Sequence, residues 1–155
     1  MSTAPVLVAC CGNRTRGDDA AGLLVADVLR ETPDPRVEVA DLGMDPSALL
    51  NMLENRHALV VADAARWDGA EPGDVLEFDW PDIDAVREAR LSGHGLSLLD
   101  HLDLAGRLGL LPPATHVVAV AIERAEAGES ASAAVVEGAD EAAERIRRWV
   151  ARHVA

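Results

Sequence analysis

The chain has 155 residues, 49% of them hydrophobic, and its 27 acidic and 14 basic side chains give a formal net charge of −13. This length and apolar content predict one globular domain over residues 1–155. A surface this acidic repels phosphate backbones and anionic lipids, which argues against nucleic acid and membranes as partners. All the basic residues are arginine, and the absence of lysine excludes Schiff-base chemistry and P-loop phosphate binding.

The two cysteines, Cys10 and Cys11, are neighbours in the first apolar run. Successive residues of a strand point to opposite faces, so these two thiols cannot easily bridge each other. We interpret them as small buried side chains in a reducing cytosol. The sequence shows no signal peptide and no apolar run of about 20 residues that could span a bilayer. We therefore expect a soluble cytoplasmic protein.

The first apolar run meets a glycine-bounded turn and then a helical pattern. We predict a strand over residues 5–11, a turn over residues 12–17 and a helix over residues 18–31. Asp18 is the expected N-cap of this helix, because its carboxylate can accept an amide of the first turn. Asp19 would then be the first helical residue, with no capping role to explain it.

The run over residues 57–63 is continuously apolar, as in a central parallel strand, and it closes with Asp63. About ten residues with two turn signals separate Asp63 from a strand over residues 74–78. That gap is too short for a crossover helix, so this strand is expected to pair antiparallel at an edge. The other predicted elements are a strand over 36–42, a short helix from Asp45 to about residue 54, a helical turn over 83–87, a helix over 94–108, a strand over 116–122 and a C-terminal helix started or interrupted near Gly138.

The alternation of strands and helices predicts an α/β fold, a three-layer α/β/α sandwich. Its sheet would have five strands, mostly parallel, with one antiparallel edge strand. Right-handed crossovers favour the strand order 36–42, 5–11, 57–63, 116–122. The strands over 5–11 and 57–63 are then neighbours at the switch point, where ligands bind at the carboxyl edge of such sheets.

Three side chains fall on that predicted edge. Asp19 follows the first strand and Asp63 closes the third. His94 begins a helix, where the positive end of the helix dipole favours a neutral imidazole that can act as a ligand. Two carboxylates and a neutral imidazole suit a borderline divalent ion such as Ni²⁺ or Zn²⁺.

Each of these residues also has a structural interpretation. Adjacent acids at a helix start are usually caps, an aspartate at a strand end often bonds a loop, and a histidine at a helix start is more often structural than a ligand. The spacing alone leaves both interpretations open.

Three sequence segments, taken together, point to a protein family more specifically than any single residue does. They are Gly12-Asn13-Arg14-Thr15-Arg16-Gly17-Asp18-Asp19 after the apolar run, Val60-Val61-Ala62-Asp63-Ala64, and Ser92-Gly93-His94-Gly95-Leu96-Ser97-Leu98-Leu99. Through them, and over nearly the whole chain, the sequence resembles the [NiFe]-hydrogenase maturation endopeptidases. The resemblance implies the α/β/α sandwich and places Asp19, Asp63 and His94 at the nickel-ligand positions of an aspartyl-type endopeptidase, as its catalytic and metal-binding residues.

The resemblance also implies a substrate. The protein would remove the C-terminal extension of a hydrogenase large-subunit precursor after nickel insertion, and the nickel would belong to the precursor, with no organic cofactor. Whether the ion only marks a finished precursor or also activates water stays open. The alternative is a non-catalytic, nickel-dependent assembly chaperone or checkpoint for the same precursor.

The sequence departs from the family pattern at several positions, which bears on the choice of precursor more than on the ligand set. Cys10-Cys11 places a thiol close to the predicted site. The other departures are Arg14-Thr15, Ala20, Arg124 and the loop Gly128-Glu129-Ser130.

Other enzyme classes lack essential residues. A receiver domain needs a lysine after its fifth strand, and a dinucleotide-binding domain needs a Gly-x-Gly-x-x-Gly turn. Neither a His-Glu-x-x-His nor a Gly-x-Ser-x-Gly motif is present. Ser92, Ser97, Asp100 and His101 lie too close together along one helix to act as a triad. Trp67 and Trp80 are expected in core or hinge positions, with contact to the precursor as the alternative.

Overall fold

The computed structural model describes residues 3–82, 84–85, 90–91, 95–123 and 125–154; of residues 90–91 and 95–97 it describes the backbone alone. Its sheet has the order β2-β1-β3-β6-β4, with β5 paired to the end of β3 off this path. The strands are β1 (Val6–Cys11), β2 (Val37–Gly43), β3 (Ala58–Arg66), β4 (Val75–Asp79), β5 (Arg90–Leu91) and β6 (Ala114–Ala121). The helices are η1 (Gly17–Ala20), α1 (Ala21–Glu31), η2 (Pro46–Met52), α3 (Gly95–Arg107) and α4 (Ala133–His153), where η marks a 3-10 helix.

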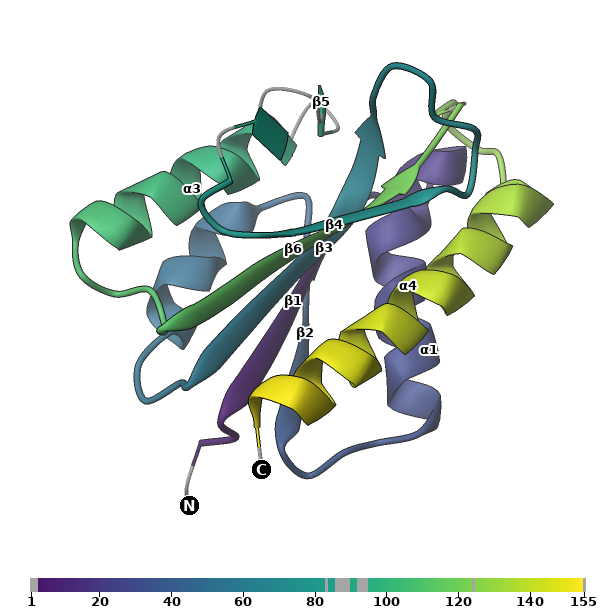
Figure 1. Ribbon diagram of the computed structural model, residues 1–155. Helices are drawn as coiled ribbons and strands as arrows, with labels where there is room; N and C mark the ends of the chain where they lie inside the picture. The colour runs from purple at the N-terminus through teal and green to yellow at the C-terminus, as the bar shows by residue number, and fades with distance from the viewer. Residues whose placement is uncertain (1–2, 83, 86–89, 92–94, 124, 155) are drawn as a thin grey trace.

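Helices cover both faces of the sheet (Figure 1). α1 and α4 pack on one face, over a buried cluster that includes Val60 and Trp149. α3 and η2 pack on the other, over a cluster that includes Leu59 and Leu98. β1 and most of β3 are buried along their length, because both of their faces are covered. The predicted three-layer sandwich is confirmed.

The sheet is mostly parallel, as predicted. β1 pairs in parallel with β2 and β3, and β3 pairs in parallel with β6. β4 pairs antiparallel with β6 at the edge, which confirms the inference from the short connection after β3.

The edge strand β4 is tied to the rest of the molecule by His116 of β6. Its two ring nitrogens lie 2.7 Å from Asp79 Oδ1 and 2.9 Å from Glu77 Oε2, both on β4. The ring also stacks on Trp149 of α4, with centroids 5.0 Å apart. The hydrogen bond from His116 lowers the pKa of Asp79 below its usual range. The sequence analysis singled out none of these partners, because they meet only in the tertiary structure.

The start of the first helix differs from the prediction. Gly17–Ala20 form η1, and the N-cap position of α1 is Ala20. Asp18 is therefore not a helix cap. By contrast η2 begins as predicted, since Asp45 Oδ1 accepts the Ser47 amide at 3.0 Å.

β3 extends past its predicted end. Asp63 lies opposite Ala119 of β6, and the strand continues to Arg66. Its last two residues pair with β5, which is too short to show a pattern in the sequence. The helical turn expected over residues 83–87 falls largely outside the described residues.

Gly138 was predicted to start or interrupt the last helix, and this is wrong. α4 begins after Ser132, whose hydroxyl accepts the Val135 amide at 3.4 Å, and it runs without a break to His153. Gly138 instead lies against Gly73, the residue two before β4. A Cβ on Gly138 would lie 2.7 Å from Gly73 Cα, closer than real Cβ contacts come. None of the described helices is long and apolar enough to cross a membrane.

Replacing Gly138 by alanine should therefore destabilise the fold by about 1–3 kcal/mol, because α4 must move away from backbone atoms that cannot yield. Urea unfolding followed by circular dichroism measures the change. Gly106→Ala in α3 is the matched control, since its Cβ would meet only Leu111 Cδ1 at 3.4 Å. That variant should gain up to about 1 kcal/mol from helix propensity. Equal effects of the two substitutions would contradict the close packing at Gly138.

Candidate functional site

Two of the three predicted site residues lie at the carboxyl edge of the sheet. Asp19 belongs to η1, which follows β1 and packs against β3, and Asp63 belongs to β3 itself. Cys10 of β1 pairs with Ala62 of β3, so the end of β1 lies beside Asp63. Both carboxylates are buried, with 6% of Asp19 and 1% of Asp63 exposed. The predicted juxtaposition of β1 and β3 is thus confirmed.

Gly22 brings the start of α1 onto this edge. A Cβ on Gly22 would overlap the carbonyl oxygen of Cys11, and it would lie 2.8 Å from Ala62 O and 3.1 Å from Asp63 Cα. Only a glycine allows so close an approach. Asp19 is three residues before Gly22, so this contact fixes η1 beside Asp63. Sequence analysis did not single out Gly22, although an isolated glycine in a helical pattern is itself a signal of close packing.

Asp63 has a defined orientation. Its Oδ1 accepts the backbone amide of Ala64 at 2.8 Å. Side chains alternate along a strand, so Asp63 points to the same face as Leu59 and Val61, the face that α3 covers. Asp63 was expected to close its strand, but it lies within the strand, three residues before the end of β3.

Asp18 has a role that the sequence did not indicate. Its carboxylate accepts the amide of Ser132 at 2.7 Å and that of Glu123 at 3.3 Å, more than a hundred residues away in the sequence. Only 2% of the residue is exposed. Amide donors around a buried carboxylate stabilise its charge and hold the donor segment in place.

His94, the third predicted site residue, lies outside the described residues. Among the residues that the structure describes, no group of three or more histidine, cysteine, aspartate or glutamate side chains is placed to hold a metal ion. The complete set of Asp19, Asp63 and His94 therefore stays a prediction. The nearest described residues before and after His94 are Leu91, which pairs with Ala65 at the end of β3, and Gly95, the first residue of α3.

Comparisons with known proteins identify the family of this chain. Residues 24–149 match the family model described as hydrogenase maturation protease. The chain belongs to the hydrogenase maturation protease family. The resemblance found in the sequence is thus confirmed, and with it the expectation of an endopeptidase.

Individual relatives are similar over most of their length. The hydrogenase 2 maturation protease of Escherichia coli K12 is 30% identical over 124 residues, which cover 78% of this chain and 75% of that protein. The structure of the hydrogenase maturating endopeptidase HybD from E. coli is 27% identical, with a TM-score of 0.82 over 95% of this chain and 92% of that one. HybD from Thermococcus kodakarensis, a [NiFe] hydrogenase maturation protease, is also 27% identical, with a TM-score of 0.79 over 93% and 97%.

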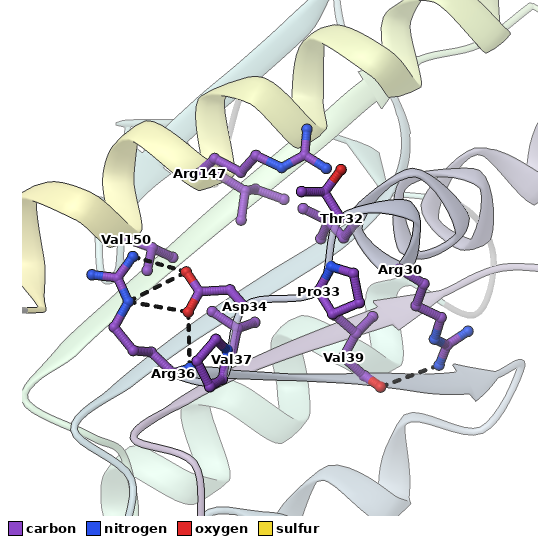
Figure 2. A pocket seen from close by; sticks show the side chains of 12 residues that line it. Arg30, Thr32, Pro33, Asp34, Arg36, Val37, Val39, Arg147 and Val150 are labelled. Atoms are coloured by element: carbon purple, nitrogen blue, oxygen red, sulfur yellow. Dashed lines mark hydrogen bonds and ion pairs between the residues drawn. The ribbon is translucent and has the colours of Figure 1, made fainter.

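The protease has a cavity of about 420 Å³ far from the candidate site. It lies at the amino end of β2, between the last turns of α1 and α4 (Figure 2). Arg36 and Asp34 pair on its rim at 2.8 Å, and Arg30 donates to the carbonyl of Val39. Its position at the opposite edge of the sheet separates it from Asp19 and Asp63.

Trp80 of the protease is partly buried against the cluster under α3, which agrees with the expected core role. Trp67 is half-buried in the turn after β3. Asp100 and His101 lie on α3, whereas the side chains of Ser92 and Ser97 are not among those described.

The two thiols of the protease are free and buried on opposite faces of β1, as predicted. Burial raises the pKa of Cys10 to about 12. Burial raises the pKa of Cys11 as well, and the nearby Asp63 carboxylate adds to the effect. Cys11 thus places a thiol near the candidate site, as the sequence indicated, but in its unreactive protonated form.

Both thiols should therefore resist iodoacetamide at pH 8 in the folded protein, because burial keeps them protonated and covered. In denaturant both should react, since an exposed cysteine has a pKa of about 8.5. Intact-mass spectrometry before and after unfolding counts the modified thiols. Rapid labelling of either cysteine in the folded protein would contradict the burial of β1.

Proposed function

We propose that the protease removes the C-terminal extension of a [NiFe]-hydrogenase large-subunit precursor after nickel insertion, and that it recognises the nickel with Asp19, Asp63 and His94. The observation that carries the proposal is the placement of two buried carboxylates at one sheet edge in a chain of this family. In this proposal nickel is part of the substrate, and no organic cofactor is required.

The chemistry of the donors supports a cation as the recognised feature. Carboxylate oxygens are good ligands of a divalent cation, and a cation bound between two buried carboxylates would stabilise their charge. The amide of Ala64 fixes the orientation of the Asp63 carboxylate, as the hydrogen-bonding partners of metal ligands commonly do. A precursor without nickel would lack this attraction, which links tail removal to metal insertion.

The chain around His94 supports its inclusion. β5 holds Leu91 against Ala65, two residues beyond Asp63. His94 is three residues after Leu91, and three residues span at most about 11 Å. α3 starts at the next residue and covers the sheet face to which Asp63 points. An imidazole with two carboxylates suits nickel.

A carboxylate at this edge could also take a proton from an attacking water. The alternative function, a nickel-dependent chaperone or checkpoint, would use the same three residues to bind the precursor without cutting it. We place the protease in the cytoplasm, because its two free thiols fit a reducing compartment.

Asp63→Asn should abolish removal of the extension while leaving the melting temperature nearly unchanged. Asparagine keeps an oxygen for the Ala64 amide but loses the charge that attracts the nickel. His94→Ala should have the same effect on processing. The measurement is incubation with purified nickel-loaded precursor and mass spectrometry of the product.

Asp68→Asn is the matched control, because Asp68 is exposed in the turn after β3. That variant should process the precursor at the normal rate. An intact tail after incubation with the unchanged protein, together with tight binding of the precursor, would favour the chaperone. Unfolding of the Asp63 variant would show that this carboxylate is structural.

A further inference from the structure

Two loops at the carboxyl edge are joined along their length. One runs from residue 12 through η1 to residue 20. The other, the 123–132 loop, connects β6 to α4 and is described except at residue 124. Backbone hydrogen bonds join Gly17 N to Glu129 O at 2.9 Å and Gly128 N to Thr15 O at 2.7 Å. The Arg16 guanidinium also donates to the carbonyl of Ala125, at 3.0 and 3.2 Å.

Asp18 contributes a buried side chain to this junction. The contact from Arg16 is made at the exposed surface. Asp18 instead accepts the amides of Glu123 and Ser132, one near each end of the second loop. One carboxylate thus holds both ends of the loop against the first turn.

The same residue is the chain neighbour of Asp19. The backbone of Asp19 is held by hydrogen bonds that remain within its own loop, from its amide to Arg16 O and from the Asn13 amide to its carbonyl, each at 3.0 Å. η1 has no side-chain cap of its own. Gly17 and Asp18, directly before Asp19, tie η1 to the second loop.

We propose that Asp18 is a positioning residue of the protease: by anchoring the 123–132 loop to η1, its carboxylate fixes the placement of Asp19 at the carboxyl edge. This inference rests on the proposed function only for its expected effect on kinetics. Its expected effect on the structure does not depend on that function. Asp18 has no contact with the substrate in this role and acts through Asp19.

The test is Asp18→Asn, which keeps the shape of the side chain but replaces one acceptor oxygen by an amide group. The amides of Glu123 and Ser132 bond different oxygens of Asp18, and the NH2 group that replaces one oxygen cannot accept a hydrogen bond. One end of the loop is therefore released. The matched control is Ser132→Ala. It removes the hydroxyl that caps α4 at Val135 but retains the Ser132 amide that donates to Asp18.

Crystal structures of the two variants give the first readout. In Asp18→Asn the carboxylate of Asp19 and the turn of η1 should shift or lose order, whereas in Ser132→Ala they should stay in place. An Asp19 carboxylate that keeps its position in Asp18→Asn would overturn the proposal, whatever the activity of the protein.

Kinetics with nickel-loaded precursor give the second readout. Asp18→Asn should lower kcat about 10- to 100-fold and also raise KM, because a displaced Asp19 slows the reaction and holds the nickel of the precursor less well. Ser132→Ala should retain normal kcat although it loses a helix cap. Normal kcat in Asp18→Asn would overturn the proposal. Failure of the unchanged protein to process the precursor would refute the proposed function instead, and the crystal structures would still decide the role of Asp18.

Discussion

The contact between Gly22 and the backbone of β1 and β3 determines how the carboxyl edge is built. Helix α1 lies so close to these strands that a single added carbon would stand 2.8 Å from Ala62 O and 3.1 Å from Asp63 Cα. Such an approach leaves no freedom in the height of the helix above the sheet. η1 therefore has only one position beside Asp63, and that position also places Asp19.

Three aspartates are buried at this edge in a chain whose formal net charge is already −13. Removing a carboxylate from water is costly unless nearby donors stabilise it. Asp18 receives two backbone amides from a distant loop, and Asp63 receives the amide of the next residue. These donors come from backbone that the fold has already fixed, so the negative charge is oriented at little further cost in entropy. Under the proposed function, a cation held by the precursor would meet a preformed arrangement.

Other contacts hold the sheet and its helices together. His116 joins the antiparallel edge strand β4 to α4 through Glu77, Asp79 and Trp149. Gly138 and Gly73 allow α4 to lie close to the segment before β4. The protease thus has close glycine contacts and buried polar side chains both beside its edge strand β4 and at the candidate site.

The sequence by itself determined the layers, the strand order and the antiparallel edge, because these follow from apolar periodicity and from connection lengths that are local properties of the chain. It also indicated Asp19 and Asp63 as neighbours, since parallel strands that alternate with helices end at one edge. Only the tertiary structure decided that Asp18 binds a loop more than a hundred residues away, that Asp63 lies within its strand, and that Gly138 is a packing contact. Each of these depends on which backbone atoms meet across the fold, and hydrogen bonds and close contacts between distant segments leave no periodic signal in a single sequence.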